Sequence, residues 1–268
     1  VKEIMLAYYA MESNSPSDLK EKWLGLLAKI EPNVCYLHSK FVNNRLHNIN
    51  IYSMVGEYLR EKAGITDCSE YFDQCWPLQM AHFDENGMYM DPGNPMLYDI
   101  TTRCHLALML FSGYRGKYAE ILDAHLKKAG LWTLFMQSAA SEFPYGGRSN
   151  QFLFNEILVA ADCEYQASRY KKLGDLKLAG MFKRCGHLAV KSMERWLEHH
   201  PPMHIKNFYP HRENFGIDDY GIYERYMIAL GSFSYMAYLF ADDDIEEFVC
   251  PAETGGFVFQ TSENFHKV

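Results

Sequence analysis

The segment that organises the chain is Phe143-Pro-Tyr-Gly-Gly-Arg-Ser-Asn-Gln-Phe-Leu-Phe-Asn-Glu156. A proline and a pair of glycines near its start are typical of a tight turn. Ser149 follows as a candidate N-cap, because a serine hydroxyl can accept hydrogen bonds from the first free N–H groups of a helix. A helical pattern then continues to about residue 172. We therefore expect Arg148 at the N-terminus of a long helix, with Asn150 and Glu156 in its first turns.

The same helical periodicity recurs along most of the chain. The predicted helices cover about residues 1–13, 18–30, 48–63, 69–82, 96–111, 117–138, 149–172, 175–200 and 220–240. Residues 255–261 alternate between apolar and polar side chains and form the one predicted strand. The sequence therefore predicts an all-α fold with a strand near its end.

The spacing of the connections indicates how the helices are arranged. Long connections precede every second helix, and these helices open near Asn48, Tyr98, Ser149 and Tyr220. Helical hairpins with long connections on one rim are typical of an (α/α) toroid. Nine helices are fewer than six hairpins need, so we expect a toroid over 1–250 that is incomplete at the N-terminus. Residues 251–268 are expected to start a β-sandwich-type domain, and we expect the chain to be truncated at both ends.

The composition limits the class of partner. The chain has 268 residues, of which 48% are hydrophobic and 22% charged, and this balance suits a globular protein with a large core. A net charge of −8 argues against nucleic acid and against an anionic membrane as partners. Seven cysteines without regular spacing favour a reducing compartment over a disulfide framework. We therefore expect a cytoplasmic protein, or a periplasmic one if a signal peptide has been lost, and a homo-oligomer is possible.

The four long connections would bring polar and aromatic residues to one rim. The candidates are Asn48 from the first connection; Tyr98 and Asp99 from the second; Glu142, Tyr145, Arg148, Asn150 and Glu156 from the third; and His204, Asn207, Tyr209, His211 and Tyr220 from the fourth. Such side chains suit a sugar, because aromatic faces stack on the ring and amides bind hydroxyls. An arginine can hold a uronate carboxylate in a bidentate fork. We therefore expect an oligo- or polysaccharide that contains uronic acid.

Two reactions fit this set of residues. In β-elimination, Arg or Asn neutralises the uronate carboxylate while Tyr or His moves the protons. In hydrolysis, two carboxylates flank the glycosidic bond, and Asp99, Glu142, Glu156 and Asp219 are candidates. We assign catalytic roles to Tyr98, Glu156, His211 and Tyr220 and substrate binding to the other rim candidates.

Several of these residues also have a structural interpretation. Asp99 and Arg103 lie four apart on a helix, so they can simply form an ion pair. Glu156 can hold a backbone group internally, and His105 on an apolar helix can be a core histidine. No motif for a metal ion or a phosphate is present, and we expect no cofactor.

Two segments resemble a family of bacterial toroids. They are Asp84-Glu-Asn-Gly-Met-Tyr-Met-Asp-Pro-Gly-Asn-Pro-Met-Leu-Tyr-Asp99 and Phe143-Pro-Tyr-Gly-Gly-Arg-Ser149. They are similar to a domain of unknown function that is related to heparinase- and alginate-lyase-type toroids and to toroidal β-glucuronidases. The resemblance spans about residues 43–266 as architecture, and by match it marks Tyr98 and Arg148. The Asn-His pair of the lyases is missing, and Asn207 and His211 are the nearest substitutes.

The resemblance implies a carbohydrate-active enzyme that cleaves a glycosidic bond at a uronic acid. We favour an exo-acting hydrolase similar to a β-glucuronidase, because one arginine-centred pocket in an acidic protein suits a single terminal uronate. The alternatives are a polysaccharide lyase with Tyr/His acid–base chemistry and a toroid that binds a glycan without cleaving it.

Overall fold

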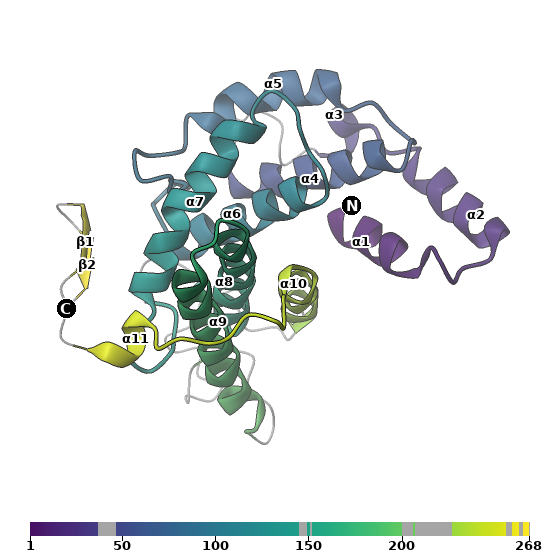
Figure 1. The fold of residues 1–268 in the computed structure, drawn as a ribbon. Helices are drawn as coiled ribbons and strands as arrows, with labels where there is room; N and C mark the ends of the chain where they lie inside the picture. Colours follow the sequence, from purple (N-terminus) through teal and green to yellow (C-terminus); the bar gives the residue numbers. More distant parts are fainter. Residues whose placement is uncertain are drawn as a thin grey trace, which may run out of the picture. The chain divides into compact units, whose positions relative to one another are not determined.

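The computed structural model describes residues 1–36, 47–144, 149–150, 152–199, 206, 227–255, 259–262 and 265–267. Most of the described residues are helical, which confirms the all-α prediction (Figure 1). The helices are α1 (Lys2–Met11), α2 (Ser17–Leu27), α3 (Pro32–Cys35), α4 (Asn48–Lys62), α5 (Ser69–Met80), α6 (Met96–Phe111), α7 (Ala119–Met136), α8 (Phe154–Lys172), α9 (Leu176–Leu197), α10 (Met227–Phe240) and α11 (Pro251–Thr254). Two short strands, β1 (Phe259–Ser262) and β2 (Phe265–Lys267), pair antiparallel.

The predicted start of the helix after the 143–156 segment is wrong. Ser149 has φ +68° and so lies in the left-handed region, whereas an N-cap residue is normally extended. Helix α8 begins later, at Phe154, and its N-cap Leu153 makes no side-chain cap hydrogen bond. Asn150 therefore lies in the turn before the helix, and Glu156 is the third helical residue.

Other boundaries agree more closely with the prediction. Helix α6 covers the predicted residues 96–111, and α4 begins at the predicted Asn48. The short helices α3 and α11 and the strand β2 were not predicted. The predicted strand is found as β1, which starts later than expected. The predicted opening of the last long helix at Tyr220 lies outside the described residues, where α10 is described from Met227 onward.

The chain divides into two compact units, with one boundary after Phe83, one within α6 and one within α7. One unit comprises Val1–Phe83 and His105–Asp123, and the other comprises Asp84–Cys104 and Ala124–Val268. In the first unit α1 packs on α4. Two aromatic rings of α5 pack against Tyr114 in the same unit. The ring centroids of Phe72 and Trp76 lie 6.0 and 5.8 Å from that of Tyr114. The predicted toroid domain, 1–250, stays a prediction.

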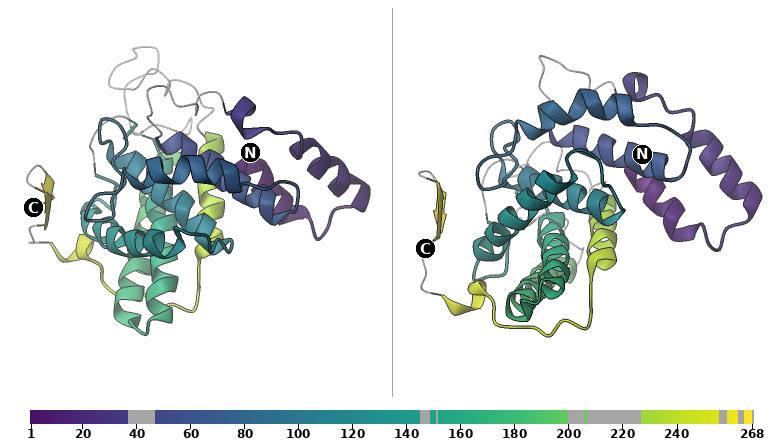
Figure 2. Two further views of the ribbon diagram at one scale, coloured as in Figure 1. Left: turned by 90° about the horizontal axis from the view of Figure 1, so that it is seen from above. Right: turned by 45° about the horizontal axis from the view of Figure 1, so that its top comes forward.

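The second unit is built on the hairpin of α8 and α9. A three-residue link joins the two helices, with Gly174 at φ +83° and Asp175 accepting from the Leu178 N–H at the start of α9. Helix α10 runs beside α8 (Figure 2). Phe233 and Phe240 of α10 meet α8 edge to face, through Phe154 and Tyr165 respectively. This packing fixes α8, whose first turn carries several predicted site residues.

The long connection before α6 is an ordered turn that rests on α7. The Asp84 carboxylate accepts from the N–H groups of Asn86 and Met88, and the Trp132 indole donates to the carbonyl of Asn86 at 3.2 Å. Gly87 closes the turn at φ +75°, and a Cβ there would lie 2.5 Å from the carbonyl oxygen of His125. Only glycine fits this position, because both the backbone angle and the close approach exclude a side chain.

We expect Gly87→Ala to lower the free energy of unfolding by roughly 2–4 kcal/mol, as the sum of left-handed strain and a backbone clash. The matched control is Gly64→Ala, because Gly64 has φ +73° but a Cβ there meets nothing within 4 Å. The control should lose only about 1–2 kcal/mol, from the strain. Urea unfolding of both variants measures the difference, and equal losses would contradict this account of the turn.

Candidate functional site

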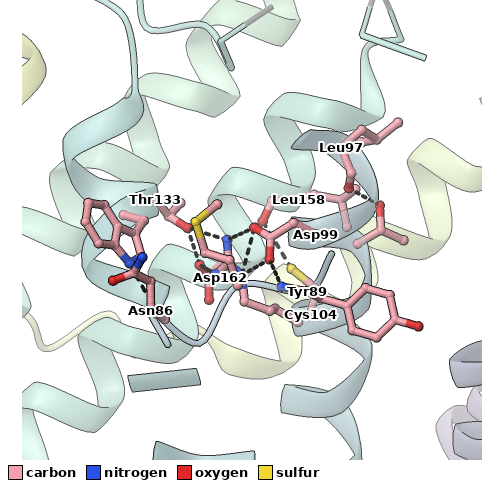
Figure 3. Close-up of polar contacts among 12 residues, drawn as sticks. Asn86, Tyr89, Leu97, Asp99, Cys104, Thr133, Leu158 and Asp162 are labelled. Atoms are coloured by element: carbon pink, nitrogen blue, oxygen red, sulfur yellow. Dashed lines mark hydrogen bonds and ion pairs between the residues drawn. The ribbon is translucent and has the colours of Figure 1, made fainter. Parts of the chain in front are cut away.

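A buried ion cluster in the second unit contains one of the predicted site residues, Asp99. Arg103 of α6 donates to Asp99 Oδ2 at 2.8 Å and to Asp162 Oδ2 of α8 at 2.6 Å. Thr133 of α7 accepts from Arg103 at 3.0 Å and donates to Asp162 at 2.5 Å (Figure 3). Although burial opposes the charge, the two carboxylates raise the pKa of Arg103 above its ordinary value. One guanidinium thus joins three helices.

The same cluster holds the connection before α6. Asp99 Oδ1 accepts from the backbone N–H of Tyr89 at 2.7 Å and from Arg103 Nε at 3.0 Å. The structural interpretation of Asp99, an ion pair with Arg103, is therefore confirmed. The residue is 4% exposed, and both of its carboxylate oxygens accept from the protein. A substrate contact for Asp99 stays a prediction that this geometry does not favour.

Tyr98 and Ser149 bring two of the long connections together. Tyr98 lies in the first turn of α6, and its hydroxyl is 3.0 Å from the Ser149 hydroxyl in the turn before α8. Tyr98 is half-buried, whereas Ser149 is buried. Ser149 thus adopts a left-handed conformation, and its hydroxyl contacts Tyr98 of the other connection. This contact is found in place of the predicted helix cap.

Glu156 forms a second link, to the connection that precedes α10. Its Oε1 accepts from the backbone N–H of Phe143 at 3.0 Å and from Lys206 Nζ at 2.7 Å. Both side chains of the ion pair are completely buried. Burial raises the pKa of Glu156, although Lys206 acts in the opposite direction. The interpretation that Glu156 holds a backbone group internally is confirmed.

Two asparagines complete the turn before α8. Asn150 donates to the carbonyl of Pro144 at 3.3 Å, and Asn155 donates to the carbonyl of Ser149 at 3.1 Å. Among the described residues, no partner is found for the side-chain carbonyl oxygens of these asparagines or for Glu156 Oε2. Three buried acceptor oxygens therefore lie within seven residues of Ser149, the residue that contacts Tyr98.

The other predicted site residues are placed differently or not at all. Glu142 is partly buried and lies 3.6 Å from Arg195, whereas Asn48 is buried at the start of α4 in the first unit. His105 is completely buried and packs against Tyr52, as expected for a core histidine. Eight predicted residues lie outside the described part of the chain: Tyr145, Arg148, His204, Asn207, Tyr209, His211, Asp219 and Tyr220.

Two residues that are central to these contacts, Lys206 and Asp162, are not predicted from the sequence. Lys206 is a lone lysine in an aromatic and polar connection, and this isolation is the only local signal for a buried partner. Asp162 lies on α8, fifty-nine residues from Arg103, and no local pattern links them. Within the described ranges, no cluster of His, Cys, Asp and Glu side chains could hold a metal ion. No helix among the described residues is long and apolar enough to cross a bilayer.

Comparison with protein-family models, with curated proteins and with solved structures finds no significant match to this chain.

We expect Arg103→Met to lower the free energy of unfolding by about 3–5 kcal/mol, because it leaves two buried carboxylates without their cation. The matched control is Arg195→Met on α9, where the arginine side chain is 58% exposed and its ion pair is long. That variant should lose no more than about 1 kcal/mol. Denaturant unfolding tests both variants, and a loss below about 1 kcal/mol for Arg103→Met would contradict the assigned role.

Proposed function

We propose that the chain is a carbohydrate-active enzyme that cleaves a glycosidic bond next to a uronic acid. The observation that carries the proposal is the convergence of three long connections at the first turn of α8. Tyr98 and Ser149 join the second connection to the third, and Glu156 and Lys206 join the third to the fourth. Enzyme sites are commonly built from loops that a rigid helical scaffold brings together.

The proposed architecture is an (α/α) toroid of the heparinase and alginate-lyase kind. The support comes from the two motifs that resemble this group and from the order of long and short connections. In the second unit, the convergence of long connections near the start of α8 agrees with functional loops on one rim. The toroid arrangement and the family membership are both part of the proposal.

Two of the candidate carboxylates, Asp99 and Glu156, already bind groups of the protein, and this favours elimination over hydrolysis. A glycoside hydrolase needs two carboxyl groups on either side of the bond. Asp99 is occupied by Arg103, and Glu156 holds Lys206 and a backbone N–H. Tyr98, by contrast, is a half-buried residue whose hydroxyl lies 3.0 Å from the Ser149 hydroxyl. A polysaccharide lyase is therefore the better-supported reaction, although sequence analysis favoured a hydrolase.

In the proposed elimination, Arg148 neutralises the uronate carboxylate and so acidifies the adjacent C–H. The Tyr98 oxygen accepts that proton, the C–O bond to the leaving sugar breaks, and a carbon–carbon double bond forms. Tyr98, now protonated, returns its proton to the leaving oxygen. Protons and electron pairs balance without a cofactor, and the products are a shortened glycan and an unsaturated uronate.

Hydrolysis remains the second candidate because of one atom. Glu156 Oε2 has no partner among the described residues, and burial raises the pKa of this carboxyl group. A general acid gives a proton to the leaving oxygen, and Oε2 is the oxygen of Glu156 that no described residue occupies. Either Glu142 or a carboxylate outside the described residues would then have to supply the second group.

The test is a panel of uronate-containing oligosaccharides followed by two signals, the absorbance of an unsaturated uronate and the release of reducing ends. We expect both signals from the same bond cleavage. Reducing ends without new absorbance would favour the hydrolase, and binding without either signal would favour the non-catalytic toroid.

We expect Tyr98→Phe to lower kcat by about 10²–10⁴-fold, because the variant removes the group that transfers the proton. The matched control is Tyr238→Phe on α10, whose tyrosine is 74% exposed and far from any proposed role. The control should keep full activity. A Tyr98→Phe variant with wild-type kcat would remove Tyr98 from the mechanism.

A further inference from the structure

Three buried thiols belong to α8, to α9 and to the N-cap of α11. Cys163 of α8, Cys185 of α9 and Cys250 before α11 are each 0% exposed, and all three are free thiols. A single buried cysteine usually acts as a small apolar residue. Two facing thiols have a further property, because the loss of two electrons can join them in a disulfide. The geometry of the α8–α9 hairpin decides which of these thiols face each other.

The register of the hairpin places Cys163 and Cys185 at the same level. Helices α8 and α9 lie side by side and are joined by a short link, as in an antiparallel helical hairpin (Figure 2). Cys163 lies eleven residues before Gly174 in the middle of this link, and Cys185 lies eleven residues after it. The ion pair of Glu164 with Lys183 at 3.0 Å supports this register, since these residues lie ten before and nine after the same glycine.

Small residues bring the two helices close together at this level. A Cβ at Gly186 would lie 3.3 Å from the Cβ of Cys163 and 3.6 Å from the carbonyl oxygen of Ala160. Gly186 is next to Cys185 in the chain, so the Cys163 side chain meets α9 beside Cys185. Burial raises the pKa of the Cys163 thiol, and the nearby Cys185 thiol raises this pKa further. The two thiols are therefore neighbours across the helix interface.

We propose that Cys163 and Cys185 are a latent disulfide site, which closes when the hairpin folds under oxidising conditions. One protein thiolate attacks a small disulfide such as oxidised glutathione and releases one glutathione thiol. The second protein thiolate then displaces the other glutathione, so that two protein thiols are oxidised while one glutathione disulfide is reduced to two thiols. In a reducing compartment, glutathione and thioredoxin keep both cysteines reduced. The inference does not depend on the proposed glycan cleavage.

Cys250 is the competing partner for Cys185. Burial raises the pKa of the Cys250 thiol, and the charge of a Cys185 thiolate raises it further, so the two lie within electrostatic reach. The start of α11 holds Cys250, whose backbone N–H donates to Glu253 at 3.2 Å. The register of the hairpin sets Cys163, and not Cys250, opposite Cys185. Cys250→Ala is therefore the matched control, because it removes an equally buried thiol and leaves the proposed pair intact.

The experiment refolds the full chain from denaturant, once with dithiothreitol and once with a mixture of reduced and oxidised glutathione. Free thiols are then alkylated, and tryptic peptides are identified by mass spectrometry without reduction. Trypsin separates the two cysteines, because Arg169 and Arg184 lie between them. In the glutathione sample we expect the peptides of Cys163 and Cys185 to be linked and the other five of the seven cysteines to be alkylated. The absence of this link, or a link of Cys185 to Cys250, would overturn the proposal.

Thermal unfolding measures what the link does to the fold. A bond between α8 and α9 restricts the unfolded chain, so the Tm of the wild type should be at least about 5 °C higher in the glutathione sample. Cys250→Ala should show the same rise, and Cys163→Ala should show none. Each variant is compared with its own reduced sample, so the cost of the substitution cancels. A linked wild type with an unchanged or lower Tm would contradict the site, because the native geometry would then not accept the bond.

The folded protein tests when the link forms. Burial and a raised pKa leave little reactive thiolate at Cys163 in the native hairpin. The same glutathione mixture, added to the folded and reduced chain, should therefore form the link at least about 100-fold more slowly than refolding does. Equal rates in the two samples would overturn closure during folding.

Discussion

The ion cluster around Arg103 is the interaction on which the second unit depends. A fully buried guanidinium is tolerated only because two carboxylates and a hydroxyl surround it. Those partners come from α6, α7 and α8, so satisfying the charge requires the three helices to lie together. The connection before α6 is attached to the same cluster through Asp99, which also accepts from the backbone of Tyr89.

The ion cluster also holds residues of the proposed site in place. Asp99 and Tyr98 are neighbours at the start of α6, so the cluster that fixes Asp99 also fixes the segment that presents the Tyr98 hydroxyl. On the facing element, Glu156 and Asn155 hold the turn before α8 by its backbone. Each of the three connections is thus tied to the helices by buried polar contacts, which are directional and therefore fix geometry more exactly than apolar packing does.

The helices could be predicted because their signals are local. Helix α6 is one continuous apolar pattern between a Pro-rich connection and a glycine, and α9 begins next to residue 175, where a helix is predicted to start. Ser149 shows where local signals fail, since a serine after two glycines suits either a helix cap or a turn. Its contact with Tyr98, fifty-one residues away, accompanies the turn, and no local pattern contains that information. For the same reason, the sequence could not predict two ion pairs, Arg103 with Asp162 and Glu156 with Lys206.

The central claim is that a uronate-containing glycan binds where the three connections meet, and a structure of the complex tests it most directly. Tyr98→Phe, which should bind but not cleave, would be crystallised with a uronate-terminated oligosaccharide. The account predicts a sugar ring within hydrogen-bond distance of Ser149 or Asn150 and beside the ring of residue 98. A glycan bound elsewhere, with no contact to residue 98 or to the turn before α8, would contradict it.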